Sequence, residues 1–162
     1  AGADPGVRLH VNGAASGDDG LDLAGLAAQE GVADLVTFSG PVPAPALAAQ
    51  FRAADVVAMP SASETYGLVA LEAQACGTPV LAHRVGGLVY AVLDGVSGRH
   101  VTAGTPEAWA DALAEILADR DAWAALGPGA VRHAAGHSWE AYADGLLEAV
   151  AAVPRRSPGL DA

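Results

Sequence analysis

The sequence predicts an α/β fold, with an open, doubly wound, Rossmann-like parallel sheet followed by a helical carboxyl-terminal tail. Short apolar runs alternate with Ala- and Leu-rich helical segments at the spacing typical of parallel strands. Turns that contain Gly or Pro separate these segments. Beyond the last apolar run, only helical segments follow. In this fold class, ligands bind at the carboxyl ends of the strands.

Strands and helices alternate over the first hundred residues. The expected strands are 7–12, 35–39, 55–59, 79–82 and 98–101. The expected helices between them are 21–30, 44–54, 67–76 and 88–93, and a loop is expected at 13–20. The strand at 55–59 is a short apolar run closed by Pro60 and Ser61. The helix at 67–76 is rich in Ala, Leu, Glu and Gln, and Gly77-Thr78-Pro79 ends it.

The last third of the chain is expected to be helical. Thr105 is a good cap and Pro106 a good first residue for a helix that runs to about residue 118. Further helices are expected at 121–126, 129–135 and 138–150. Three tryptophans are expected to pack these helices together: Trp109, Trp123 and Trp139. Residues 1–150 are interpreted as one domain, and residues 151–162 as a flexible tail.

Composition limits the classes of protein to consider. A chain of 162 residues is long enough for one domain with a real core. It contains no run of about 18 apolar residues, so we expect no transmembrane segment, and no leader is seen at its start. We therefore expect a cytoplasmic protein. The formal net charge of −11 argues against binding nucleic acid or acidic lipid. The single Cys76 excludes an internal disulfide and a cysteine metal cage.

Two glutamates, Glu64 and Glu72, stand at the junction between the third strand and the helix that follows it. The first N–H groups of a helix lack intrahelical partners and carry the positive end of its dipole, so they attract anions. Two carboxylates at such a place can each accept hydrogen bonds from the vicinal hydroxyls of a sugar. The alternative interpretation is that Glu64 caps the helix and Glu72 is a solvated helix residue.

The segment resembles a known signature. Residues 64–68 (Glu-Thr-Tyr-Gly-Leu) and 72–80 (Glu-Ala-Gln-Ala-Cys-Gly-Thr-Pro-Val) resemble the Glu-x7-Glu motif of retaining glycosyltransferases of family 4, which have the two-domain GT-B fold. Flanking stretches at 51–56, 85–88, 94–98 and 137–139 are also similar, so the resemblance extends from about residue 7 to 150. Within the family, residues 67–80 most resemble mycothiol-pathway enzymes that transfer N-acetylglucosamine from UDP-GlcNAc to inositol phosphate.

The resemblance implies roles for individual residues. Glu64, at the catalytic centre, would hold hydroxyls of the donor hexose, and Glu72 would hold the 2′- and 3′-hydroxyls of the ribose. The diphosphate would lie against the N–H groups of four consecutive residues: Tyr66, Gly67, Leu68 and Val69. Because Gly67 has no Cβ, it would let the phosphate come near.

Other glycine-bearing loops are weaker site candidates. The resemblance implies that Gly13 lies near the donor, and that Gly40 and Val42 lie beside the nucleobase. A plain turn remains the alternative for each of them. Gly86 and Gly87 allow close approach of the backbone, either to the donor sugar or within a tight turn.

The resemblance also implies that the chain is part of a longer enzyme. Family members carry an Arg and a Lys, which neutralise the diphosphate, on a strand–helix unit that precedes the residue where this chain begins. They also carry an amino-terminal acceptor-binding domain. We therefore expect the carboxyl-terminal GT-B domain without its first strand–helix unit. Such a piece would bind UDP weakly, transfer nothing alone and need no metal or other cofactor.

A missing strand would leave an exposed edge that invites self-association. Two alternatives stay open for the function. One is another family-4 hexosyltransferase, with UDP-glucose or GDP-mannose as donor. The other is a nucleotide-sugar-binding module without catalysis.

Overall fold

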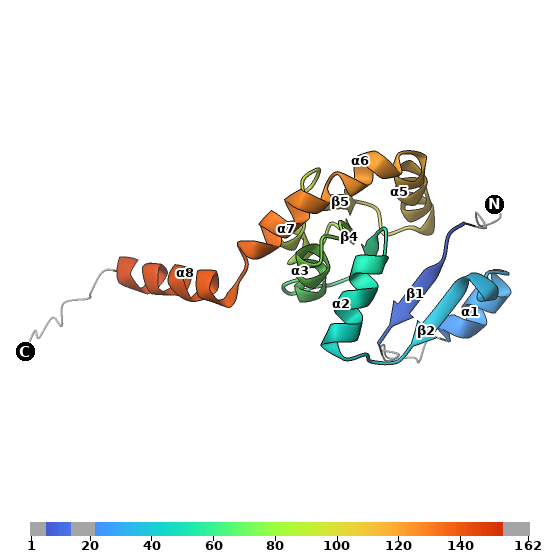
Figure 1. Ribbon diagram of the computed structural model, residues 1–162, viewed down its shortest axis with the longest axis horizontal. Coiled ribbons are helices and arrows are strands. Elements are labelled where there is room, and N and C mark those ends of the chain that lie inside the picture. The colour runs from blue at the N-terminus through green and yellow to red at the C-terminus, as the bar shows by residue number, and fades with distance from the viewer. Residues whose placement is uncertain (1–5, 14–21, 154–162) are drawn as a thin grey trace, which may run out of the picture. The chain divides into compact units, whose positions relative to one another are not determined.

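The computed structural model describes residues 6–13 and 22–153, and the chain divides into two compact units, residues 1–47 and 48–162 (Figure 1). The predicted loop after Gly13 and most of the predicted carboxyl-terminal tail lie outside the described residues. Helix α2 (Ala44–Ala53) connects the two units. Each unit contains its own parallel sheet.

The first unit is a pair of parallel strands with a helical crossover. Strand β1 (Leu9–Asn12) pairs in parallel with β2 (Val36–Ser39), and helix α1 (Leu23–Gln29) and the short 3-10 helix η1 (Ala33–Leu35) lie between them in the chain. Asp22 caps α1 by accepting a hydrogen bond from the Gly25 N–H at 2.8 Å. This unit has the βαβ form that parallel strands require.

The second unit is built on three parallel strands in the order β3-β4-β5. These are β3 (Val57–Met59), β4 (Val80–His83) and β5 (Gly98–Val101). Helix α3 (Leu68–Ala75) connects β3 to β4, and the short α4 (Leu88–Ala91) connects β4 to β5. Val80, Leu81 and Ala82 are almost entirely buried. Because successive side chains of a strand point to opposite faces, both faces of β4 are covered.

One side of this sheet is closed by helices from later in the chain. Helices α5 (Pro106–Ala118) and α6 (Arg120–Ala124) follow β5. Their Ile116 and Trp123 pack with Leu81 and Val101 of the strands into one apolar cluster. The Trp123 indole N–H donates to the Asp55 carbonyl at 2.9 Å. The buried Trp therefore fixes α6 to the start of β3, and its polar atom is satisfied.

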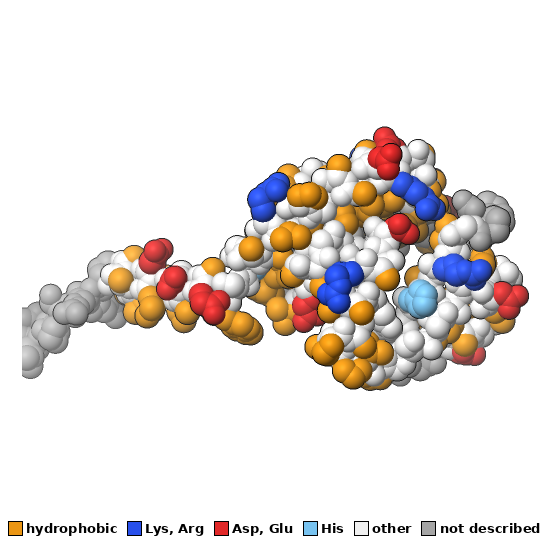
Figure 2. All heavy atoms as spheres, in the orientation of Figure 1, with side chains coloured by type: hydrophobic (Ala, Val, Ile, Leu, Met, Phe, Trp, Pro, Cys, Tyr) orange, Lys and Arg blue, Asp and Glu red, His pale blue; other side chains and the backbone are white. Residues whose placement is uncertain are grey.

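Helices α7 (Gly127–Ala135) and α8 (Trp139–Ala152) end the described chain. Helix α7 packs against α3 (Figure 1). Every side chain of α8 is exposed, and its apolar and acidic side chains appear together on the surface in Figure 2. Trp139 at the start of α8 is 81% exposed, so the prediction that this Trp packs helices together is wrong. No helix among the described residues is long and apolar enough to cross a membrane.

The predicted α/β class with parallel strands is confirmed, and each expected strand and helix occurs within a few residues of its expected place. The 3-10 helix η1 is an addition. In the described part of the chain the strands form two separate sheets, β1-β2 and β3-β4-β5.

Candidate functional site

The segment between β3 and α3 has the strand–loop–helix form predicted for it. Strand β3 ends at Met59, a loop follows, and α3 begins at Leu68 with Gly67 as its N-cap residue. Gly67 has φ 92° and ψ 38°, the left-handed region that favours glycine. A Cβ on Gly67 would also lie 2.7 Å from the Ala91 Cβ. Close packing against α4 therefore explains this glycine without any ligand, and its Cβ-free side faces α4.

The amino-terminal end of α3 carries backbone donors that nothing in the described chain satisfies. The first backbone bond of the helix runs from the Leu71 N–H to the Gly67 carbonyl at 3.1 Å. The N-cap residue offers no side-chain acceptor. Four consecutive N–H groups thus have no partner among the described residues: Gly67, Leu68, Val69 and Ala70. Gly67 and Ala70 are buried residues, whereas Leu68 and Val69 are exposed, so at least part of this helix start is open to a ligand.

Tyr66 differs from the residues that follow it. Its N–H donates to the Glu64 Oε1 at 3.3 Å, and the Thr65 N–H donates to the same oxygen at 3.0 Å. The Tyr66 N–H is therefore occupied in this structure, unlike the donors that begin at Gly67. The Tyr66 side chain is 42% exposed.

Glu64 is half-buried, and its carboxylate turns towards the backbone that follows it. Both donors belong to loop residues that precede α3, so Glu64 does not cap the helix itself. A carboxylate has about four acceptor positions, so two remain for other donors such as sugar hydroxyls. The geometry of Glu64 is therefore compatible with a sugar-binding role, whereas it does not show the expected helix cap.

Glu72 lies on the exposed side of α3. The buried side of this helix is formed by Ala70, Leu71, Ala73 and Gln74. Leu68 and Glu72 are four positions apart, so they share the opposite face. The Glu72 carboxylate makes no hydrogen bond or ion pair within the described chain. It is thus free to meet a ligand, and equally free to be solvated.

Gly86 and Gly87 pack against the loop that carries Glu64. The Gly87 N–H donates to the Glu64 carbonyl at 2.8 Å. A Cβ on Gly87 would come within 2.5 Å of the Thr65 carbonyl oxygen, and a Cβ on Gly86 would overlap the Glu64 carbonyl. The glycine pair therefore allows two backbone segments to touch. In the structure its partner is the loop before α3.

Gly13, Gly40 and Val42 belong to the first unit, whereas Glu64 and Glu72 belong to the second. The Gly13 N–H donates to the Ser39 carbonyl at 3.1 Å, immediately after β1. Gly40 and Val42 follow β2. All three thus lie at the carboxyl ends of a parallel pair, where ligands of such sheets bind.

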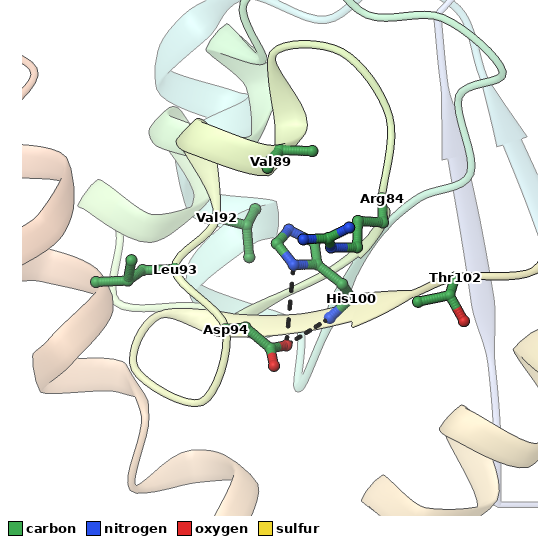
Figure 3. Close-up of a pocket in the computed structure, with 7 residues that line it drawn as sticks. All are labelled: Arg84, Val89, Val92, Leu93, Asp94, His100 and Thr102. Atoms are coloured by element: carbon green, nitrogen blue, oxygen red, sulfur yellow. Dashed lines mark hydrogen bonds and ion pairs between the residues drawn. The ribbon is translucent and has the colours of Figure 1, made fainter.

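Two hollows open on the second unit. One, of about 370 Å³, is lined by Arg84, Val89, Val92, Leu93, Asp94, His100 and Thr102 (Figure 3). Its His100 side chain is 8% exposed, donates from Nε2 to the Leu88 carbonyl and has Nδ1 3.9 Å from the Asp94 carboxylate. This hollow contains none of the predicted site residues. A smaller one, of about 210 Å³, is lined partly by Thr65, Tyr66 and Gly87.

Comparison with known proteins identifies the family. Residues 2–133 match the family described as glycosyl transferases group 1. The chain belongs to this family. A D-inositol 3-phosphate glycosyltransferase of Segniliparus rotundus is 52% identical over 156 residues, which cover 94% of this chain and 34% of the relative. A protein of the same name from Thermobispora bispora is 56% identical over 126 residues, covering 78% of this chain and 29% of the relative.

Solved glycosyltransferase structures share the fold. Sucrose-phosphate synthase from Thermosynechococcus elongatus superposes with a TM-score of 0.79 at 35% identity, covering 90% of this chain and 39% of that one. The HepE protein of Anabaena in complex with UDP gives 0.76 at 25% identity, covering 93% and 42%. The predicted likeness to the carboxyl-terminal domain of GT-B glycosyltransferases is confirmed. The chain spans about a third of the length of the curated relatives named above.

The structure also brings His83 to the loop after β3, and the sequence analysis did not identify this residue. This residue ends β4, and its Nδ1 lies 3.0 Å from the Ser61 carbonyl in the loop after β3. The available signal was a polar residue at the carboxyl end of an otherwise apolar strand, where ligand-side residues of α/β sheets stand.

Proposed function

We propose that the chain is the donor-binding half of a retaining glycosyltransferase of family 4, which transfers a hexosyl group from a UDP-sugar to an acceptor hydroxyl. The observation that carries this proposal is the set of unpaired N–H groups at the start of α3, with Glu64 before the helix and Glu72 within it. Membership of the glycosyl transferases group 1 family supports it.

The diphosphate of the donor would accept hydrogen bonds from the N–H groups that start at Gly67. Negative charge grows on the diphosphate as the sugar–phosphate bond breaks, so donors fixed in place before the reaction stabilise the transition state. The helix dipole adds to this attraction. The Tyr66 N–H is left out of this set because Glu64 already occupies it.

Glu72 would accept from the ribose 2′- and 3′-hydroxyls, and Glu64 from hydroxyls of the donor hexose. Glu64 has acceptor positions to spare beyond its bonds to Thr65 and Tyr66, and Glu72 has no competing partner in the described chain. Both are positioning roles, in which geometry matters more than proton transfer. Gly13, Gly40 and Val42, which follow the parallel strands β1 and β2, are further candidates for nucleotide contact.

The names of the relatives guide the choice of substrates. Curated relatives are called D-inositol 3-phosphate glycosyltransferases, and the HepE structures hold UDP or UDP-glucose. We infer a UDP-sugar donor, with N-acetylglucosamine as its hexose, and an inositol phosphate as acceptor. The acceptor would be held by parts of a longer enzyme that this chain does not span. The chain alone would therefore bind donor and transfer nothing.

Charge predicts that this binding is weak. The chain has a formal net charge of −11, so a diphosphate approaches against the overall field. The favourable part is local, from the amides at the start of α3. Cations outside this chain would complete the site in the longer enzyme. The mechanism proposed here uses no metal.

Titration of the 162-residue chain tests the proposal. UDP, UDP-GlcNAc, UDP-glucose and GDP-mannose are added separately, and the amide resonances of residues 67–70 are followed by NMR. We expect UDP ligands to shift these amides, with UDP-GlcNAc binding most tightly. Tightest binding of UDP-glucose or GDP-mannose would favour another hexosyltransferase of the family. No shift at these amides with any ligand would contradict the proposal.

Transfer is tested separately with the chain joined to the amino-terminal part of a relative. Donor binding without transfer in that longer protein would favour a non-catalytic binding module. Transfer with retention of configuration at the anomeric carbon supports the proposed enzyme. Inversion would contradict the retaining mechanism.

A further inference from the structure

The loop from Pro60 to Tyr66 carries Glu64, and few hydrogen bonds join it to the rest of the second unit. Its described hydrogen bonds to the rest of the second unit are two. The Gly87 N–H donates to the Glu64 carbonyl at 2.8 Å, and His83 bonds to the Ser61 carbonyl at 3.0 Å. The Glu64 side chain adds bonds only to its own neighbours. His83 is thus the one side chain outside the loop that hydrogen-bonds to it within the described chain.

The His83 ring is itself held firmly. His83 ends β4 and pairs in register with Val101 of β5. The Arg84 N–H donates to the Val101 carbonyl at 2.9 Å, so β5 holds the backbone next to His83. In the segment that follows β5, a Cβ on Gly104 would lie 3.2 Å from the His83 Cε1, which shows that the ring packs against this residue.

The chemistry of the bond fixes its direction. A carbonyl oxygen only accepts, so the His83 Nδ1 carries the hydrogen and donates to the Ser61 carbonyl. His83 thereby joins the loop after β3 to the carboxyl ends of β4 and β5. Ser61 is three residues from Glu64, and the Gly87 bond holds Glu64 itself. These two points of attachment lie close together and hold the stretch of backbone that carries the Glu64 side chain.

We propose that His83 is a positioning residue for donor recognition, which holds the loop so that Glu64 meets the hexose of the nucleotide-sugar. This inference rests on the proposed function. His83 acts through Ser61 and need not touch the ligand. Its effect should therefore fall on the hexose and spare the nucleoside diphosphate, which the start of α3 would hold.

Three variants separate this role from general structural support. Asn places its Nδ2 where His places Nδ1, so His83→Asn keeps the bond to the Ser61 carbonyl. Gln carries its amide one bond further out, and His83→Ala removes the donor. Affinity for UDP-GlcNAc and for UDP alone is measured on the full 162-residue chain. We expect His83→Ala and His83→Gln to weaken UDP-GlcNAc about fivefold, as for loss of one net hydrogen bond, and UDP less than twofold. His83→Asn should recover most of the loss.

Amide hydrogen exchange provides a readout that needs no ligand. The Gly87 N–H reports directly on the loop, because its acceptor is the Glu64 carbonyl. We expect it to exchange about five times faster in His83→Ala and His83→Gln, and at nearly the wild-type rate in His83→Asn. His133→Ala is the matched control, because it removes another histidine-to-carbonyl bond, from His133 to Tyr90 at 3.2 Å.

Each outcome is decisive. Unchanged exchange and unchanged UDP-GlcNAc affinity in His83→Ala overturn the inference. Equal loss of UDP and UDP-GlcNAc, with a lower melting temperature and no recovery by Asn, also overturns it and leaves a structural role. A wild-type chain that binds neither ligand contradicts the proposed function and the donor role of His83 with it. The exchange rates then still decide whether His83 anchors the loop.

Discussion

Helices α3 and α5 begin in opposite ways. At α5, Thr105 accepts a hydrogen bond from the Ala108 N–H, Pro106 has no N–H to satisfy, and Glu107 complements the dipole. At α3, Gly67 offers no side chain, the first turn contains no acidic residue, and four amides have no partner in the described chain. The start of α5 is thus capped by its own residues, whereas the start of α3 keeps N–H groups without a partner in the described chain.

The other helix starts show that the bare end of α3 is not a general feature of the chain. Asp22, Asp119 and Ser138 cap α1, α6 and α8 with side-chain acceptors. Helix α4 has no such cap, but carbonyls of the preceding turn accept from its first amides. Helix α7 also lacks a side-chain cap; Pro128 in its first turn has no N–H, and the N–H of the buried Gly129 has no partner among the described residues. The contrast supports the proposal that a ligand binds at the start of α3.

The largest expected effect comes from filling the left-handed position at the start of α3. Gly67→Ala would force a Cβ into an unfavourable φ and against Ala91 at 2.7 Å. Strain and overpacking together should lower the free energy of unfolding by about 3 kcal/mol. Chemical denaturation of both proteins measures the difference in the free energy of unfolding.

Gly145→Ala is the matched control for that variant. A Cβ there meets nothing within 4 Å, and Gly145 lies inside α8. It should leave stability unchanged or raise it by up to about 1 kcal/mol. A Gly67→Ala protein as stable as Gly145→Ala would show that the close contact with α4 is not formed in solution.

The sequence predicted features that depend on neighbouring residues, and it did not predict contacts between residues far apart in the chain. Both helix starts were placed within a residue, because Thr105-Pro106 and the Ala-, Leu-, Glu- and Gln-rich run that begins at Gly67 are local signals. The close approach of the glycine pair to the loop was only half predicted, since glycine shows that something comes near without showing what. The bond between His83 and Ser61 joins residues 22 positions apart, and no local pattern encodes it. Trp139 was misplaced because helix periodicity does not say whether a partner surface is present.

The next effect concerns ligand affinity at the bare helix end. Glu72→Ala should weaken UDP about 30-fold, because two hydrogen bonds from ribose to a charged acceptor are lost. Stability should change by less than about 0.5 kcal/mol, since Glu72 is exposed and unpaired in the described chain. Isothermal titration calorimetry with UDP measures the affinity. Glu148→Ala, in the exposed helix α8, is the control. Equal UDP affinity in the two variants would contradict the proposal that Glu72 binds the ribose.

Glu64→Ala should have a smaller and more selective effect. We expect UDP-GlcNAc to bind about tenfold more weakly and UDP less than twofold, since Glu64 would contact only the hexose. Competition between the two ligands, followed by NMR, measures the difference. Glu64→Gln is the control, because it keeps one acceptor oxygen for the Thr65 and Tyr66 N–H groups. An equal loss of both ligands would show instead that Glu64 mainly shapes the loop.

Removing the cap of α5 tests the opposite side of the comparison. Thr105→Ala should lower the free energy of unfolding by about 0.5 to 1 kcal/mol, at the low end for a cap because the hydrogen bond is long, 3.4 Å. It should leave UDP affinity unchanged. Thr102→Ala, an exposed threonine without a described hydrogen bond, is the control for thermal unfolding. Loss of UDP binding in Thr105→Ala would contradict the distinction between the capped start of α5 and the proposed ligand-binding start of α3.

The smallest effect is expected at the capped start of α8. The backbone N–H of Glu140 and, to a lesser extent, the Ser138 hydroxyl lower the pKa of the Glu140 carboxyl. A carboxyl whose pKa is lower in the folded chain than in the unfolded chain stabilises the fold above the unfolded pKa. That contribution is lost as the pH falls through the folded value. NMR titration of the native chain and of the chain in urea should therefore give a lower Glu140 pKa in the native chain. Ser138→Ala should recover only the smaller part of the shift, because the backbone N–H remains. Complete recovery in Ser138→Ala would show that the hydroxyl, rather than the helix end itself, holds the charge.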